Sequence, residues 1–400
     1  MYKKNQNNLY KEITVIGGAG HVGLAFALIC AEKKIKVHIH DTNVDSINLI
    51  KKGILPHKED NAKKILRNAL NKKLFTFSSE IEKIKLNKIN VICLGTPIDE
   101  FLNPQHKIII NLLKKLNKYL KNSHHIIIRS TLFPGTTNFI HNFYLKKNKK
   151  LNVTFYPERF VQGFAINEFK KFPQIIGPVN KKSEIESVHF LKKLAKEIII
   201  LNPMEAELTK LFLNSYRYVQ FSIANQFYKI ADSANLSYEK INHAMSYKYK
   251  RGKVPSPGLT SGPCLFKDTM QLYSFAKNDF SLGMDAMTTN EGIVNYIVEK
   301  IQKQTDISNK TVGILGMAFK AESDDNRSSL SYKLKNILGM FAKNVLTTDP
   351  YIQDDKDLIN LQKILKDSDI LILATPHKVY KKIKTKKKII DIWNFFNLKN

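Results

Sequence analysis

A cysteine in a loop-like segment has the features of a catalytic nucleophile. In "GLTSGPCLFKDTMQL" (258–272), Cys264 follows a proline and a run of small residues, and Lys267 and Asp268 come within about one helical turn. Small residues let the backbone approach a ligand closely, and a nearby ammonium favours the nucleophilic thiolate. The alternative is that Cys264 is a small buried hydrophobe. The pattern favours the nucleophile and leaves the alternative open.

Lys210 and Asn214 could bind one oxygen atom together. They stand four residues apart in a long helical stretch, "MEAELTKLFLNSYRYVQFSIANQFYKIADSAN". Residues at i and i+4 share a helix face. The alternative is an exposed lysine beside an incidental asparagine.

Polar residues also follow several apolar, strand-like runs. Thr96 stands in "CLGTPIDE", Thr131 in "RSTLFPGT" and Glu158 in "YPERFVQG". Open α/β sheets bind ligands at the carboxyl ends of their strands. Taken singly, each threonine is a turn or cap residue and Glu158 a surface ion-pair partner. Their recurrence at one edge of the sheet favours a site.

A glycine motif predicts a dinucleotide site. The GxGxxG motif at 18–23 lies between the apolar run 13–16 and a helix-period segment, and Asp41 follows its last glycine by 18 residues. Glycines allow a tight turn and close approach to a pyrophosphate, and the acid can bind ribose hydroxyls while repelling a 2′-phosphate. NAD is therefore favoured over NADP, the alternative being a turn without a ligand. The predicted cofactor-binding residues are Gly18, Gly20, His21, Val22, Gly23, Asp41, Thr96 and Thr131.

Two cations follow a later strand. In "GMAFKAESDDNRSS", Lys320 and Arg327 come after the apolar run "TVGIL". Cations near backbone amides suit a phosphate or diphosphate group. Because the chain is rich in lysine, Lys320 alone would not indicate a phosphate site.

The elements that must position these residues alternate between strands and helices. We predict an α/β fold with two Rossmann-like, doubly wound parallel-sheet domains joined by a central helical region that contains a long helix. The expected domains are 11–202, which carries the glycine motif, 203–305, the helical region with Lys210, Asn214 and Cys264, and 306–400, the second α/β domain.

Composition excludes several classes of protein. The 400 residues carry 64 Lys and Arg against 35 Asp and Glu, but the basic runs lack interleaved aromatic or glycine motifs, so we expect no nucleic-acid partner. Three cysteines far apart suggest no disulfide framework and no metal site, which favours the cytoplasm. The segment 13–31 lacks charge and superficially resembles a membrane span, but the glycine motif explains it better. No membrane association is expected.

In chain order, these motifs resemble the UDP-glucose/GDP-mannose dehydrogenase family from about Glu12 to Trp393. The resemblance implies that a UDP-sugar substrate is oxidised at its C6 alcohol to a carboxylate with two NAD+. It also implies an N-terminal NAD domain, a central dimerisation region, a C-terminal nucleotide domain and a homodimer.

The resemblance further implies a role for each matching residue. Cys264 would capture the C6 aldehyde as a thiohemiacetal that is oxidised to a thioester, and Glu158 would assist its hydrolysis. Lys210, Asn214, Asp268 and Thr131 would hold the reacting oxygen and a water or assist proton transfer. The predicted substrate-binding residues are Glu158, Lys210, Asn214, Arg251, Lys320 and Arg327.

The chain departs from the family pattern in two places. Thr260 and Ser261 stand where glycines are common, and Gln162 replaces a glutamate. Arg159 gives the PER form that resembles the branch acting on UDP-N-acetylhexosamines, so UDP-N-acetylmannosamine is favoured over UDP-glucose. Three other classes stay open: a two-electron hydroxyacid or 6-phosphogluconate-type dehydrogenase, a basic nucleic-acid binder, and an inactive sugar-nucleotide binder.

Overall fold

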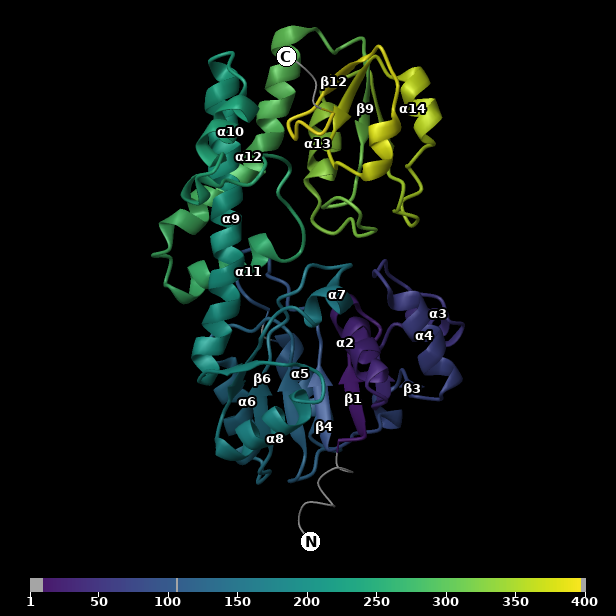
Figure 1. Ribbon diagram of the computed structural model, residues 1–400, viewed down its shortest axis with the longest axis vertical. Helices are drawn as coiled ribbons and strands as arrows, with labels where there is room; N and C mark the ends of the chain where they lie inside the picture. The colour runs from purple at the N-terminus through teal and green to yellow at the C-terminus, as the bar shows by residue number, and fades with distance from the viewer. Residues whose placement is uncertain (1–9, 106, 397–400) are drawn as a thin grey trace. The chain divides into compact units, whose positions relative to one another are not determined.

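The computed structural model describes residues 10–105 and 107–396. The chain forms two compact units, Met1–Phe212 and Leu213–Asn400, and the long helix α9 (Pro203–Ser233) contributes residues to both. Figure 1 labels the elements. Across the described residues, no helix is long and apolar enough to cross a membrane.

The first unit is built on an eight-stranded sheet of order β3-β2-β1-β4-β5-β6-β7-β8. Neighbouring strands are parallel except β6 and β7, which are antiparallel. The segment between these two strands holds only the short helix α7 (Ala165–Phe169), not the long crossover helix typical of parallel neighbours. The strands are β1 (Glu12–Ile16), β2 (Lys36–His40), β3 (Phe75–Ser78), β4 (Ile89–Ile92), β5 (His125–Ile128), β6 (Asn152–Phe155), β7 (Gln174–Pro178) and β8 (Ile198–Ile200).

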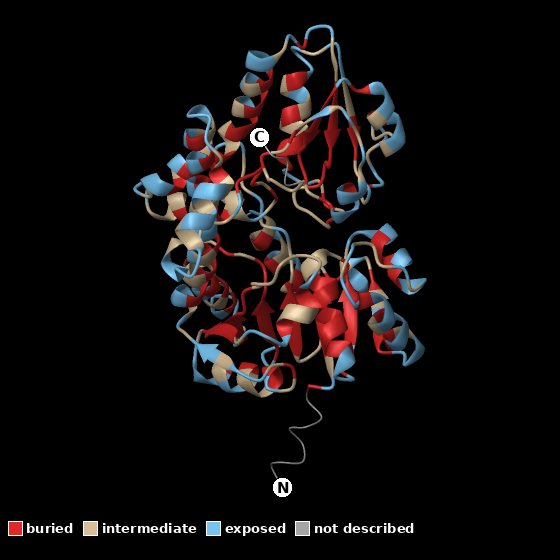
Figure 2. Cartoon of the chain, turned by 45° about the horizontal axis from the view of Figure 1, so that its top comes forward, coloured by how far each residue is buried: buried red, intermediate tan, exposed pale blue. Residues whose placement is uncertain are grey.

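Helices cover both faces of this sheet. Along β5, Ile127 belongs to the hydrophobic cluster that includes α2, whereas Ile126 and Ile128 belong to the one that includes α5 and α6. This period-two alternation buries both faces, and Figure 2 shows the strands buried throughout most of their length. The helices are α2 (His21–Glu32), α3 (Val44–Lys51), α4 (Ala62–Asn71), α5 (Lys107–Leu116), α6 (Thr136–Leu145) and α8 (Lys181–Leu191), with the 3₁₀ turn η1 (Ile81–Lys83).

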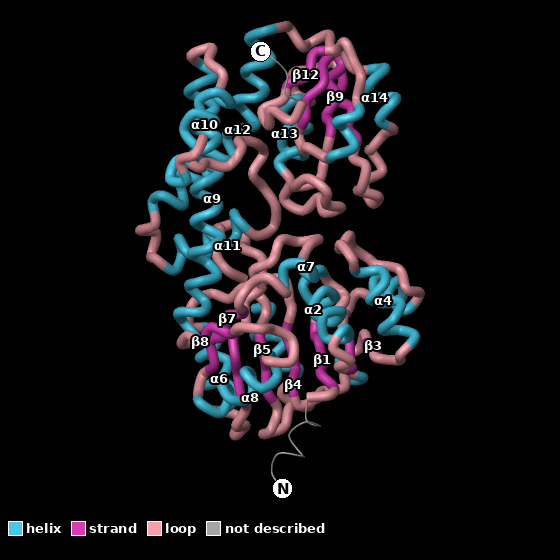
Figure 3. Tube along the Cα trace, in the orientation of Figure 1, coloured by secondary structure: helices cyan, strands magenta, loops and turns pink. Residues whose placement is uncertain are grey.

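The second unit has a parallel four-stranded sheet of order β10-β9-β11-β12 and a helical part that includes the end of α9. Figure 3 shows these helices and strands in separate colours. The strands are β9 (Thr311–Leu315), β10 (Asn344–Thr348), β11 (Ile370–Leu373) and β12 (Lys388–Ile390). The helices are α10 (Tyr238–Ser246), η2 (Lys250–Gly252), α11 (Leu265–Phe275), α12 (Ser281–Gln304), α13 (Leu330–Leu338), α14 (Leu361–Asp367) and η3 (Lys378–Lys382).

The helical part and the second sheet share one hydrophobic core. Ile293 and Ile297 of α12 pack in the same cluster as Val312 of β9 and Leu334 of α13. The two sheets and the long helix confirm the predicted fold class. The division into three domains stays a prediction, because compactness separates two units only.

Candidate active site

The glycine motif forms the turn between β1 and α2. A side chain at Gly23 would place its Cβ 2.1 Å from the Gly17 carbonyl oxygen, and one at Gly18 would lie 2.8 Å from the Val15 oxygen. Both glycines are therefore required by the packing of the turn itself. At Gly20 a Cβ would meet only the Gly17 oxygen, at 3.6 Å. The backbone is open at Gly20, which fits the close approach of a pyrophosphate to the start of α2.

Asp41 follows β2 beside this turn. One carboxylate oxygen accepts the backbone N–H of Ala19 and the other accepts that of Asn43, each at 2.9 Å. A carboxylate can accept about four hydrogen bonds, and this side chain is partly exposed. Acceptor capacity therefore remains for ribose hydroxyls.

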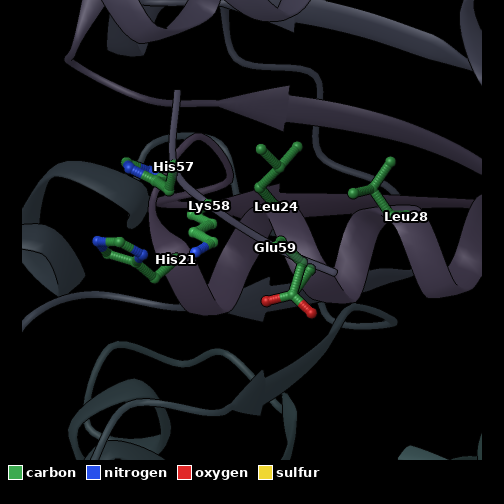
Figure 4. A pocket seen from close by; sticks show the side chains of 7 residues that line it. His21, Leu24, Leu28, His57, Lys58 and Glu59 are labelled. Carbon is green, nitrogen blue, oxygen red and sulfur yellow. The ribbon is translucent and has the colours of Figure 1, made fainter. Parts of the chain in front are cut away.

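A second loop closes over the first turn of α2. The His21 and His57 rings stack with centroids 3.8 Å apart, and His57 Nε2 lies 2.9 Å from the Ala19 oxygen. Figure 4 shows the two rings one above the other at the start of the helix. Gln162 reaches the His21 ring through its side-chain amide, at 3.0 Å. His21 therefore has protein partners, while Val22 is partly exposed on the same turn.

Glu59 lies in the same loop and lines a small cavity beside α2. Burial raises the pKa of this carboxyl to about 7; the N–H of Ile166, at 3.1 Å, opposes the shift and the negative charge of Glu158 adds to it. Sequence reasoning did not single out Glu59.

The two predicted threonines come together at the sheet edge. The Thr96 hydroxyl donates to the Thr131 carbonyl oxygen at 2.8 Å, and the Leu94 N–H donates to the Ser130 hydroxyl at 2.7 Å. These bonds join the segments that follow β4 and β5. The expectation that both threonines lie at one edge is met.

Glu158 forms an ion pair, which was the alternative considered for it, but with a buried partner that sequence reasoning did not name. Its carboxylate binds Arg129, which is 2% exposed and whose guanidinium lies 4.6 and 4.1 Å from the ring centroids of Phe26 and Tyr156. Burial lowers the pKa of Arg129, but the charge and hydrogen bond of Glu158, together with the charges of Tyr156 and Cys93, more than offset this and raise it. Arg129 directly follows the apolar run of β5, so a cation there could have been matched to the acid after β6.

Helix α9 begins with a buried acid and a nearly buried lysine. Glu207 is fully buried and accepts the N–H groups of Gly135, at 2.6 Å, and Thr137, at 2.8 Å, which ties α9 to the start of α6. Lys210 is 8% exposed, and among the residues that the structure describes no ion pair or hydrogen bond of its ammonium is found. An oxygen of a bound substrate would give this charge a partner.

In the second unit, Cys264 is exposed and occupies the residue directly before α11, where its side chain makes no capping hydrogen bond. The alternative of a buried core cysteine is therefore wrong. Asp268, in the first turn of α11, is fully buried; its carboxylate accepts the Asn214 amide at 2.6 Å and lies 2.7 Å from the Lys267 ammonium. Asn214 and Asp268 thus meet beside the helix turn that carries the cysteine.

The glycines before the cysteine have separate packing reasons. A Cβ at Gly258 would lie 2.2 Å from the Trp393 ring, and one at Gly262, which has φ of +102°, would lie 2.3 Å from the Phe319 ring. Thr260 and Ser261 are not among the residues with positive φ. The substitutions for glycine at these two positions therefore add no left-handed strain.

The loop after β9 lies against the cysteine loop. The Gly262 N–H donates to the Ser328 carbonyl at 3.1 Å. Arg327 binds both carboxylate oxygens of Asp325, which raises its pKa, and the Cys264 charge adds to the shift. Lys320 lies in the same loop, partly exposed. Thus Cys264 lies near a predicted nucleotide-binding cation.

Arg251 stands apart from this group. It is exposed on η2, and its guanidinium lies 5.2 Å from the Tyr249 ring centroid. None of the contacts found within 10–105 and 107–396 joins it to another predicted site residue. Its substrate-binding role stays a prediction.

Three sequence models of one family match consecutive parts of the chain. They describe the NAD binding domain (residues 11–199), the central domain (204–292) and the UDP binding domain (313–398) of the UDP-glucose/GDP-mannose dehydrogenase family. The chain belongs to this family. It is therefore an NAD-dependent nucleotide-sugar dehydrogenase, and the predicted cofactor NAD is confirmed.

Relatives in this dehydrogenase family cover nearly the whole chain. A UDP-N-acetyl-D-mannosamine dehydrogenase of Methanocaldococcus jannaschii is 30% identical over 99% of this chain and 95% of its own. A UDP-glucose 6-dehydrogenase of Rickettsia bellii is 26% identical over 92% and 86%. The solved UDP-D-ManNAc dehydrogenase of Pyrococcus horikoshii aligns with a TM-score of 0.89 and 26% identity, covering 97% of this chain and 96% of that one.

Proposed function

We propose that this dehydrogenase oxidises the C6 hydroxyl of UDP-N-acetylmannosamine, or a close UDP-N-acetylhexosamine, to a carboxylate with two NAD+. The names of several relatives and the PER sequence at Arg159 support this substrate. The observation that carries the mechanism is the exposed Cys264 at the start of α11, in a loop that is bonded to the loop of Arg327 through the Gly262 N–H and the Ser328 carbonyl.

The proposed reaction has four balanced steps. C6 first loses a hydride and a proton to become an aldehyde. Cys264 Sγ then bonds to the aldehyde carbon, giving a thiohemiacetal; loss of a second hydride and a proton gives a thioester. Water finally attacks that carbon, the C–S bond breaks, and the carboxylate and the thiol are released. Each NAD+ accepts one hydride. Tethering prevents escape of the aldehyde between the two oxidations.

The neighbouring side chains have distinct proposed roles. Asn214, held by Asp268, and Lys210 would bind the C6 oxygen, since both lie on one face of α9. Thr131 and Glu158 follow neighbouring strands, β5 and β6, and would hold the attacking water. Lys320 and Arg327 would bind the diphosphate. Gln162 contacts His21 beside the glycine motif. The replacement of the family's glutamate by Gln162 would therefore affect the NAD-binding part of the site rather than the sugar-binding part.

We also propose a homodimer formed through α9. Large apolar side chains are exposed along this helix: Phe212 at 55%, Tyr216 at 64%, Ile223 at 40%, Phe227 at 40% and Ile230 at 61%. Their spacing of mostly three, four and seven residues resembles a helix-packing seam. The three cysteines are free, which supports a reducing, cytoplasmic location.

The experiment that tests the function counts NADH. The protein is incubated with NAD+ and a panel of UDP- and GDP-sugars, and NADH is measured per sugar consumed. We expect two NADH with UDP-N-acetylmannosamine. Preference for UDP-glucose would favour the activity named for the Rickettsia bellii relative. One NADH per sugar would reject the four-electron scheme.

Cys264→Ser provides the matched test of the nucleophile. The variant should bind NAD normally and form no net acid, because it lacks the thiolate. Turnover equal to that of the unmodified protein would remove Cys264 from the mechanism.

A further inference from the structure

The segment that carries Cys264 is held at both ends by helix α9. At its far end, the Asn214 amide donates to Asp268 at 2.6 Å. At its near end, the Gly258 N–H donates to the Asn225 side-chain oxygen at 2.8 Å. Cys264 lies between these two attachments in the chain.

The two asparagines lie on one face of α9. They are 11 residues apart, which is three turns and about 16 Å along the axis with a net rotation of about 20°. Asn225 is fully buried, and Asn214 is 4% exposed. A single rigid helix face therefore sets both ends of the cysteine segment.

Asn225 is itself held in place by a second buried amide. Its side-chain N–H donates to the Asn290 oxygen at 2.9 Å, and the Asn290 amide donates to the Tyr218 carbonyl at 3.1 Å. Asn290, in α12, is also fully buried. Buried amides are costly without partners, so this chain of bonds allows Asn225 one orientation.

The loop has little other freedom between Gly258 and the cysteine. Gly258 lies against the Trp393 ring, Leu259 packs in the core of the second unit, and Gly262 lies against the Phe319 ring. A displacement at Gly258 would therefore be transmitted along the loop.

We propose that Asn225 is a positioning residue for Cys264. It acts through the backbone of Gly258 and is the counterpart of the Asn214–Asp268 bond on the other side of the cysteine. This inference rests on the proposed nucleophilic role of Cys264. Its consequence is that the thiol is already in place before the sugar nucleotide binds.

The test compares Asn225→Leu with Asn290→Leu in the full-length protein. Both replace a fully buried amide by an apolar side chain of similar size, but only Asn225→Leu removes the acceptor for Gly258. We expect kcat to fall about 10²-fold in Asn225→Leu with KM within about threefold, because a displacement of about 1 Å costs that much in rate while the nucleotide contacts persist. In Asn290→Leu the acceptor for Gly258 stays but loses the bond that orients it, so kcat should fall less, by about tenfold.

A second readout needs no activity. Alkylation of Cys264 by iodoacetamide, followed by peptide mass spectrometry without substrate, should slow several-fold in Asn225→Leu, because the thiol leaves the start of α11 and Arg327. Alkylation should slow less in Asn290→Leu, because the Asn225 acceptor for Gly258 remains. Equal effects of the two substitutions on kcat and alkylation would overturn the proposal and leave a shared structural role.

Should Asn225→Leu fail to fold, hydrogen exchange of the unmodified protein decides. Slow exchange of the Gly258 amide, comparable to α9, supports the proposal, and exchange at the rate of an open loop overturns it. Failure of the proposed function is seen separately, as an NADH count other than two.

Discussion

The turns after β1 and β9 are built alike, yet they leave different groups open. In both, a glycine with positive φ donates its N–H to the end of the neighbouring strand: Gly17 to His40 at 2.8 Å and Gly316 to Thr348 at 2.9 Å. An aspartate follows that strand in each unit, Asp41 after β2 and Asp349 after β10.

The two aspartates differ in what surrounds them. Asp41 is partly exposed and accepts one N–H from its turn, at 2.9 Å. Asp349 has a fully buried side chain and accepts two, from Met317 at 2.7 Å and Ala318 at 2.9 Å, and it pairs with His377 at 3.0 Å. An acid at this position can bind a ribose only where its carboxylate stays open.

The units also differ in how they can bind a phosphate. Helix α2 begins within the glycine motif, so its N-terminal N–H groups are available at the turn. Helix α13 begins only at Leu330, and the intervening loop carries Lys320 and Arg327. The first unit offers backbone amides and the second offers side-chain cations.

The largest effect is expected at Asp349. Asp349→Ala leaves a buried histidine and two buried N–H groups without their acceptor, so the free energy of unfolding should fall by about 3 kcal/mol. Asp41→Ala, the matched control, should cost less than about 1 kcal/mol, because its carboxylate is partly exposed. Chemical denaturation measures both. Equal losses would mean that the two acids have the same structural role.

The next effect concerns NAD affinity. Asp41→Ala removes the charged acceptor of hydrogen bonds from the ribose hydroxyls, worth about 1.5–3 kcal/mol, so NAD should bind about 10- to 100-fold more weakly. Discrimination against NADP should also decrease, because the carboxylate no longer repels a 2′-phosphate. Calorimetric titration with both dinucleotides measures this. Unchanged NAD affinity would remove Asp41 from the cofactor site.

A smaller effect should distinguish the glycine that contacts NAD from the glycine that the fold requires. Gly20→Ala adds a Cβ that meets only one protein atom, at 3.6 Å, so stability should change by less than about 1 kcal/mol while NAD affinity falls several-fold. Gly23→Ala serves as the contrast, since its Cβ would lie 2.1 Å from a carbonyl oxygen and should destabilise the fold. Thermal unfolding and NAD titration of both variants test this. A Gly20→Ala variant that binds NAD normally would contradict the assignment.

The remaining effects are in pH dependence. Burial first, then the charges of His40 and Lys85, lowers the pKa of His38 to about 4. Because the unfolded residue titrates near 6.5, the unfolded state binds more protons between these values, and stability should fall as pH decreases from about 6.5 to about 4. His38→Gln should flatten this slope in denaturation curves. An unchanged slope would show that another group is responsible.

The second unit should lose stability at lower pH. Burial raises the pKa of Asp349, but the hydrogen bond and charge of His377, together with the backbone N–H groups of Tyr351 and Ala318, outweigh burial and bring the pKa below the ordinary value of 3.8. Its contribution is therefore present above about pH 4 and is lost as pH falls through the folded pKa. Hydrogen exchange resolves the two units. If the backbone amides of both units lost their protection together near pH 6, the predicted difference between the two units would be wrong.

The sequence determined the elements and the residues at their ends. The period of apolar residues, the glycine motif before α2 and the absence of Pro and Gly in the predicted long helix are local features. They placed Thr96, Thr131 and Glu158 after strands and Lys210 and Asn214 on one helix face. Such predictions succeed because strand and helix periodicities act over a few neighbouring residues.

Only the tertiary structure decided which polar groups are buried and with what. Gln162 meets His21 across 141 residues, Asn225 meets Gly258 across 33, and Arg129 meets Glu158 across 29. An aspartate follows a strand in both units, but the Asp41 carboxylate is partly exposed and the Asp349 carboxylate is buried. His377 packs against Asp349 and has no counterpart described at Asp41. The physical reason is that desolvation and hydrogen-bond geometry depend on the packing of distant segments, which no local pattern encodes.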